Sequence, residues 1–159
     1  MTRDAKRTTY RELTRLENST GFLVVRTARS MKKALDTQLV ELGLTASQHT
    51  VLSTLAHSDG LSLSEVGRRV FLDKPAITGL ADRLEKDGLV QRKRTSSDRR
   101  VIKLYLTPKG RKLLRRMNEI ATSVDRDLVS VLTPEQLKQL RQMLNRIWRK
   151  ANGEEPDGS

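Results

Sequence analysis

The sequence predicts a mainly α-helical protein that carries one small β-hairpin. Hydrophobic residues make up 36% of its 159 residues, charged residues 31% and aromatic residues only 3%. This balance suits amphipathic helices with wide polar faces, whereas a β-sandwich would need more Val, Thr and aromatic residues. Two short alternating segments in mid-chain are the exception, and they predict the hairpin. A chain of this length has room for one fold unit with its own core.

A long first helix is predicted from about Gly21. Residues 1–18 before it are polar and basic with weak periodicity, and we expect a flexible basic arm there. Apolar residues then recur at three- and four-residue spacing up to Gly43, a residue type that commonly ends helices. These apolar positions are Val24, Ala28, Met31, Leu35, Leu39 and Leu42.

Two short helices follow, and each begins with a capping pattern. Thr45 precedes Gln48 by three residues, and Ser62 precedes Glu65 by the same spacing. In this pattern the hydroxyl and the longer side chain satisfy the free amides of a helix start. The first helix is expected to reach about His57 and bury Val51, Leu52 and Leu55; the second is expected to span Leu63–Val70 and bury Val66 and Val70.

A third helix is predicted between Asp73, its cap, and Gly88. Its apolar stripe consists of Ile77, Leu80, Ala81 and Leu84. Its other face carries Lys74, Pro75, Ala76, Thr78, Gly79 and Arg83. A short helix, a tight turn and a helix with small and polar residues at its start are typical of a helix-turn-helix. An ordinary helical hairpin in a bundle is the alternative interpretation.

The two alternating segments, Leu89–Arg94 and Arg100–Leu106, predict a hairpin directly after this helix. Turn-forming residues join them, and the stretch from Arg92 to Arg116 holds eleven Lys or Arg against one acid. A charge run is usually a solvated face. A basic hairpin after a recognition-type helix is instead typical of a wing, which reaches the sugar-phosphate backbone or the minor groove. The pattern as a whole predicts a winged helix-turn-helix.

Two long helices are predicted after the hairpin. Thr107 and Pro108 open the first, and Thr133, Pro134 and Gln136 open the second. The apolar positions of the first are Leu113, Met117, Ile120, Val124, Leu128 and Val131. Those of the second are Leu137, Leu140, Leu144, Ile147 and Trp148, more than a lone surface helix requires. The acidic end, residues 151–159, is expected to be disordered.

Charge and composition narrow the function. A net charge of +12 points to a polyanionic partner, nucleic acid first and an anionic membrane surface second. The absence of cysteine excludes disulfides, thiolate nucleophiles and thiol-based sensing. Without an apolar segment long enough for a signal peptide or a membrane span, we expect a cytoplasmic protein with no membrane partner. The sequence also shows no metal-ligand cluster, no phosphate-binding loop and no nucleophile constellation, so we expect neither an enzyme nor a cofactor.

Two adjoining stretches resemble the MarR family of bacterial transcription regulators. DRRVIKLYLTPKG, residues 98–110, resembles the family's wing signature, and DKPAITGLADRLEKDGLVQR, residues 73–92, resembles its recognition helix and first wing strand. The resemblance covers about residues 19–150. It implies a homodimer whose dimerisation region comprises residues 19–45 and 108–150. Residues 46–107 form the DNA-binding lobe, whose partner is a pseudo-palindromic double-stranded operator.

The resemblance also implies roles for individual residues. Arg100 stands at the position that enters the minor groove, and Asp98 is placed to orient it, although the two could simply form a surface ion pair. Pro75 and Ala76 stand where the family commonly has Ser and Thr, so base preference does not transfer from relatives. The full set of expected DNA contacts is Lys74, Pro75, Ala76, Thr78, Arg83, Ser62, Ser64, Arg94, Ser97, Asp98, Arg99 and Arg100.

Many family members release DNA when an aromatic acid or another amphipathic molecule binds. The candidate residues that would contact such an effector here are Phe22, Arg26, Met31 and His49. In the alternative interpretation Phe22 and Met31 belong to the core, whereas Arg26 and His49 are solvated or capped. A repressor is expected by default. A nonspecific architectural DNA-binding protein and a winged-helix RNA-binding factor are the functional alternatives.

Overall fold

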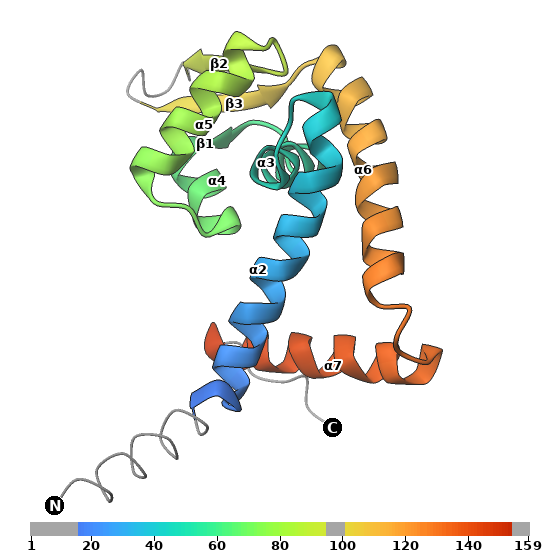
Figure 1. Cartoon of the computed structure of the whole chain (residues 1–159). Coiled ribbons are helices and arrows are strands. Elements are labelled where there is room, and N and C mark those ends of the chain that lie inside the picture. Colours follow the sequence, from blue (N-terminus) through green and yellow to red (C-terminus); the bar gives the residue numbers. More distant parts are fainter. Residues whose placement is uncertain (1–15, 95–100, 154–159) are drawn as a thin grey trace, which may run out of the picture. The chain divides into compact units, whose positions relative to one another are not determined.

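The computed structural model of the chain describes residues 16–94 and 101–153 (Figure 1). It comprises two compact units, one that ends at Thr122 and one that begins at Ser123. The elements in chain order are α2 (Thr20–Leu39), the 3-10 helix η1 (Val40–Leu42), α3 (Ala46–His57), β1 (Leu61–Ser62), α4 (Leu63–Val70), α5 (Lys74–Lys86), β2 (Val90–Arg94), β3 (Ile102–Leu106), α6 (Pro108–Leu128) and α7 (Pro134–Ala151). The predicted fold class, mainly helical with a winged helix-turn-helix, is confirmed.

The predicted start signals of the helices are confirmed. Complete capping boxes open α3 at Thr45, α4 at Ser62 and α7 at Thr133. The Asp73 carboxylate accepts a hydrogen bond from the Ala76 amide at the start of α5, 2.9 Å long. Gly43, which ends the first long helix after η1, adopts a left-handed conformation with φ of 65°, which glycine takes without steric cost. Local side-chain chemistry therefore defines where these helices begin and end.

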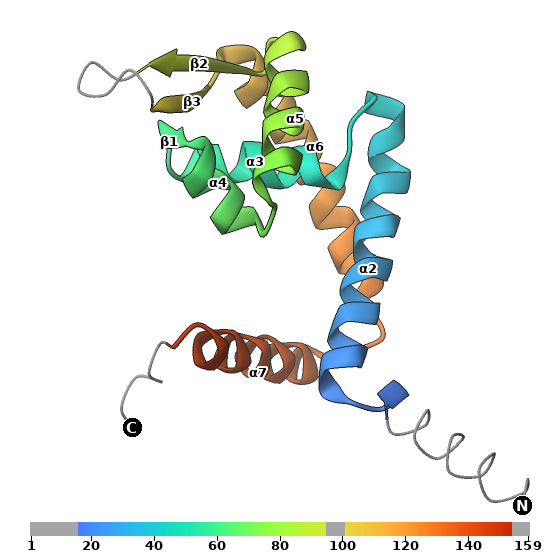
Figure 2. The same cartoon turned by 90° about the vertical axis from the view of Figure 1, so that its left-hand side faces the viewer.

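The wing is a three-stranded sheet in the order β1-β3-β2, and both pairs are antiparallel. Val90 pairs with Leu106 and Arg94 with Ile102, so β2 and β3 form the predicted hairpin, seen at the upper left of Figure 2. The sequence did not predict β1. Two residues carry no alternation, and Ser62 is also the cap of α4, so the helix signal hides the strand.

The hydrophobic core lies in the first unit, between the helices and the inner face of the wing. Val51, Leu52 and Leu55 are fully buried, as the spacing of α3 predicts, and so is Val66 of α4. Val70 is only partly buried. The stripe of α5 is confirmed at Ile77, Ala81 and Leu84, and its fourth member Leu80 is partly buried. The core also includes Leu39, Leu89, Val90, Leu104, Leu106, Leu114 and Met117.

The prediction that Val131 belongs to the apolar stripe of α6 is wrong. Val131 lies beyond the end of the helix at Leu128 and is 84% exposed. The reason is a turn: the Ser130 amide donates to the Asp127 carbonyl and the Leu132 amide to the Val129 carbonyl, which ends the helix before the cap of α7. Val131 extends the apolar periodicity without extending the helix.

The second unit consists of the end of α6 and α7. No residue of α7 is buried, although its sequence is strongly amphipathic. Met143 and Ile147 are each 52% exposed, Trp148 48% and Leu144 41%. An apolar face of this size is unusual on a helix that remains in water. Among the described residues, no helix is both long and apolar enough to cross a membrane.

Candidate nucleic-acid interface

Helix α5 presents a small, polar surface at its N-terminal end. Lys74, Pro75, Ala76, Gly79 and Arg83 are exposed, whereas the opposite stripe is buried in the core. Thr78 is half-buried, and its hydroxyl donates to the Lys74 carbonyl at 2.7 Å, so only the lone pairs of its oxygen remain for another partner. The predicted recognition residues of α5 therefore lie together on one helix, and all of them except the half-buried Thr78 are exposed.

Arg92 of β2 attaches this helix to the wing. One terminal nitrogen of its guanidinium lies 2.6 Å from Oδ1 of Asp82 and 3.6 Å from Oε2 of Glu85. The Arg92 amide also donates to Oε1 of Glu85 at 3.0 Å. Among the described residues, its buried Nε has no hydrogen-bond partner. A further nitrogen of the guanidinium donates to the Thr78 carbonyl at 3.5 Å, so four polar contacts from one residue fix the orientation of α5 relative to the wing.

The sequence interpretation missed this role of Arg92. Its position in the alternation offered a signal, because Arg92 shares the inward face of β2 with Val90, where a charged residue needs a partner. The partners Asp82 and Glu85 lie on α5 at three-residue spacing, on a helix that was otherwise interpreted only through its apolar and exposed faces. An Arg at an inward position of a strand, preceded by a helix with two acids three residues apart, is a pattern that can be recognised in a sequence.

The two serines at the start of α4, its cap Ser62 and Ser64, differ in their availability. The Ser62 hydroxyl donates to the Glu65 carboxylate at 2.7 Å and accepts from the Glu65 amide at 3.2 Å. The hydrogen bond from this hydroxyl holds the pKa of Glu65 below its ordinary range. Ser64 is exposed. Ser62 is therefore used as a cap, whereas Ser64 is free for another contact.

In the described strands of the wing, Lys93 and Lys103 lie on the outer face, whereas Arg92 and Arg94 share the face of Val90. Arg94 is exposed at the end of β2, and the Lys93 ammonium lies 5.1 Å from the centre of the Tyr105 ring. The remaining predicted wing contacts, Ser97, Asp98, Arg99 and Arg100, lie outside the described residues. The base of the wing is thus defined, and its tip stays a prediction.

The structure does not bring together the four residues that are predicted to contact an effector. Phe22 and Arg26 are exposed on α2, where the guanidinium lies 5.7 Å from the ring centre, and Met31 is half-buried two turns further along α2. His49 of α3 lies elsewhere, with Nε2 2.7 Å from Oδ1 of Asn118 on α6. Nothing in this arrangement forms one pocket from the four side chains, so their shared role stays a prediction.

A cavity of about 620 Å³ lies between α2, the start of α3 and α5. Its apolar lining includes Val40, Leu44, Leu72 and Leu80. Two cations, Lys32 of α2 and Arg83 of α5, line it as well. Pro75 and Ala76 also belong to its lining, so part of the wall is the exposed face of α5. None of Phe22, Arg26, Met31 and His49 lines it.

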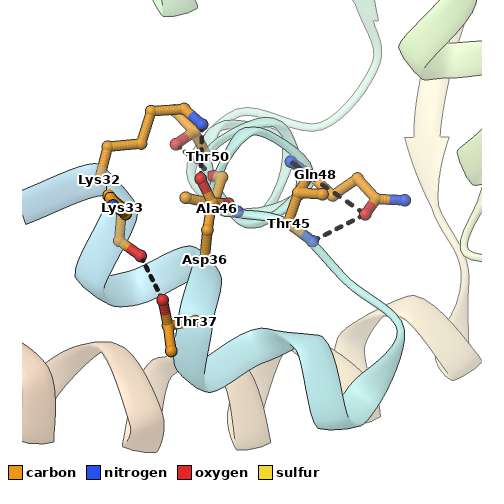
Figure 3. A network of polar contacts seen from close by, with 8 residues as sticks. All are labelled: Lys32, Lys33, Asp36, Thr37, Thr45, Ala46, Gln48 and Thr50. Atoms are coloured by element: carbon orange, nitrogen blue, oxygen red, sulfur yellow. Dashed lines mark hydrogen bonds and ion pairs between the residues drawn. The ribbon is translucent and has the colours of Figure 1, made fainter. Parts of the chain in front are cut away.

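Polar contacts hold the α2 side of this cavity in place (Figure 3). One carboxylate oxygen of Asp36 accepts from the Lys32 ammonium at 2.7 Å, and the other accepts from the Ala46 amide at 2.6 Å. Burial acts to raise the pKa of Asp36, but the hydrogen bonds from Lys32 and Ala46 outweigh it and keep the pKa below the ordinary value. Asp36 thus remains charged and joins α2 to the first turn of α3.

Comparison with known proteins agrees with this geometry. A model of the MarR family matches residues 44–102. The transcriptional regulator TtmR of Methylorubrum extorquens is 38% identical over 65% of this chain, and the match spans 53% of its own length. The organic hydroperoxide resistance transcriptional regulator of Bacillus subtilis is 31% identical over 82% of this chain and 87% of its own length.

Solved structures share the fold. A MarR family protein of Mycobacterium tuberculosis, crystallised in complex with salicylic acid, is 28% identical and superposes with a TM-score of 0.69. The superposition covers 81% of this chain and 96% of that protein. The family consists of transcriptional regulators and not of enzymes. With its helix-turn-helix, its wing and these relatives, the chain belongs to the MarR family of DNA-binding transcriptional regulators.

Proposed function

We propose that this regulator is a ligand-responsive repressor that binds a pseudo-palindromic operator as a homodimer. The observation that carries the proposal is the exposed N-terminal face of α5, which Arg92 fixes next to the wing. Base reading requires a rigid helix whose small and polar side chains reach base edges, and phosphate contacts from a wing then set its register. Repression follows when a protein bound over a promoter excludes the polymerase.

The homodimer is supported by the exposed apolar face of α7. A second copy of the same helix is the simplest cover for Met143, Ile147 and Trp148, because a two-fold interface is self-complementary. Two copies of α5 related by a two-fold axis suit an operator with half-sites about one helical turn apart.

Operator binding tests the proposal against the architectural alternative. Duplexes selected by the full chain from a random pool are expected to share a pseudo-palindrome and to bind in the nanomolar range in the presence of nonspecific competitor. Arg100→Ala is expected to weaken this binding by about 1–3 kcal/mol, because a minor-groove contact is lost. Arg126→Ala, which removes the same charge from an exposed position on α6, serves as the control. Selection that yields no shared motif, with equal binding by both variants, contradicts specific recognition.

The ligand response is supported by the cavity beside α5. Its apolar walls and its two cations, Lys32 and Arg83, suit a small aromatic acid, and the salicylic acid complex of the Mycobacterium tuberculosis relative indicates the ligand class. Because Pro75, Ala76 and Arg83 are both predicted DNA contacts and cavity residues, an occupant and the operator compete for the same side chains. Binding of the acid therefore releases DNA.

Salicylate serves as the probe of this cavity. It is expected to lower operator affinity, and Lys32→Gln is expected to raise the salicylate dissociation constant about five- to tenfold because a partly exposed charge-assisted contact is lost. Lys33→Gln is the matched control, since the neighbouring residue does not line the cavity. Isothermal titration of the free protein measures the effect. Equal salicylate affinity of both variants would show that Lys32 does not contact the bound salicylate.

A further inference from the structure

A cluster of cations lies on the first turns of α6, outside the helix-turn-helix. Arg111, Lys112, Arg115 and Arg116 are all exposed, and the first turn of α6 contains no acid. The N-terminus of a helix carries a partial positive charge, so cations in its first turns are unfavourable. Like charges four residues apart on a helix also repel. The sequence thus keeps an arrangement that lowers the stability of the free protein.

Internal partners account for only part of this charge. Arg111 forms an ion pair with Asp59 at 2.6 Å, and Lys109 donates to the Asp87 carbonyl at 2.7 Å. Among the described residues, the ion pairs include none of Lys112, Arg115 and Arg116. The contacts of the described residues therefore give these three cations no stabilising partner within the protein.

The cluster is continuous with the outer face of the wing. Lys93 lies against the Tyr105 ring, and that ring packs closely on Gly60, where a Cβ would come within 2.9 Å of it. Asp59, the residue before Gly60, forms the ion pair with Arg111. Lys103 stands opposite Lys93 in the strand register. Tyr105, Gly60 and Asp59 therefore connect the cations of the wing to those of α6, the helix that follows β3 directly in Figure 1.

We propose that this outer basic surface, made of Lys93, Lys103, Arg111, Lys112, Arg115 and Arg116, binds the phosphate backbone of duplex DNA beyond the base pairs read by α5. The inference rests on the proposed operator binding and extends it to flanking DNA. Duplex DNA fits as the occupant because its charge is complementary and because the surface adjoins the proposed DNA interface of α5 and the wing. Phosphate contacts carry no sequence information, so the surface adds affinity and length without altering base preference.

The test compares wild type with the triple variant Lys112→Gln/Arg115→Gln/Arg116→Gln on two selected duplexes, one trimmed to the half-sites and one with long flanks. Wild type is expected to bind the long duplex more tightly, and the variant is expected to lose that gain while it binds the short duplex equally well. Each phosphate contact contributes about 0.9 to the slope of log affinity against log salt. Between about 50 and 200 mM salt, the variant's affinity for the long duplex should therefore fall about 40-fold less for three lost contacts.

The control variant Lys33→Gln/Arg126→Gln/Lys138→Gln removes the same net charge from exposed positions on α2, on the last turn of α6 and on α7, and it should keep the wild-type slope and the gain from flanks. Size-exclusion chromatography confirms that both variants keep the wild-type oligomeric state. An equal loss in the two triple variants overturns the proposal, and so does wild-type affinity that is independent of flank length. A 60-bp duplex of unrelated sequence separates the two hypotheses: if no operator is selected, the reduced salt slope of the α6 variant there still supports the surface, and an unchanged slope refutes it.

Discussion

Gly110→Ala is expected to destabilise the DNA-binding lobe by at least about 3 kcal/mol, because a Cβ at this position collides with a backbone atom. The methyl group would overlap the Leu89 carbonyl oxygen and lie 3.0 Å from Cδ1 of Leu106. That carbonyl also accepts a hydrogen bond from the Thr107 amide at 3.1 Å, so it cannot turn away without loss. The close approach of α6 to Leu89, the residue before β2, therefore depends on glycine.

Thermal unfolding measures this effect. At about 2–4 °C per kcal/mol for a chain of this size, Gly110→Ala should melt at least about 6–12 °C below wild type. Gly79→Ala is the matched control, since Gly79 lies in α5 with nothing within 4 Å of its added Cβ. There the better helix propensity of alanine should stabilise the chain by about 1 kcal/mol. A melting temperature of Gly110→Ala equal to that of wild type would contradict the contact with Leu89.

Ile147→Asp is expected to separate the proposed dimer. Ile147 lies in the middle of the exposed apolar face of α7, and an unpaired carboxylate buried between two copies costs about 3–5 kcal/mol. The dimer dissociation constant should therefore rise by more than about 100-fold. Operator binding should fall with it, because a lone protomer contacts only one half-site.

Sedimentation at micromolar concentration measures the dissociation, and circular dichroism verifies that the helices persist. Gln142→Asp introduces the same charge at an exposed polar position of α7 and should leave the sedimentation unchanged. Equal sedimentation of Ile147→Asp and wild type would show that another surface holds the protomers together, or that the chain acts alone.

Much of this fold could be predicted because its boundaries depend on local chemistry. Thr45, Ser62, Asp73 and Thr133 each cap a helix through contacts with residues only three positions away, so the sequence alone contains both partners. The same locality explains the one false extension. Val131 continues an apolar spacing, but the turn that ends α6 involves backbone hydrogen bonds that leave no residue-type signal.

Features that depend on distant partners could not be predicted in the same way. Strand β1 exists because Leu61 pairs with Leu104, a residue far along the chain, and no local pattern reports that pairing. The cavity likewise requires α2 and α5 to approach each other, so Lys32 and Arg83 were not recognised as neighbours. The exposed face of α5 was found by periodicity alone, because it is the complement of a buried stripe.

The attachment of α5 to the wing through Arg92 also determines how this protein responds to ionic strength. The Arg92 side chain is 23% exposed and the Asp82 side chain 56%, so dissolved ions screen this pair less than a pair in which both side chains are open to water. Phosphate contacts weaken steeply as salt increases. Rising salt thus removes the sequence-independent part of the binding energy first, while the orientation of the recognition helix persists. The proposed discrimination between operator and other DNA depends on this geometry rather than on the phosphate contacts.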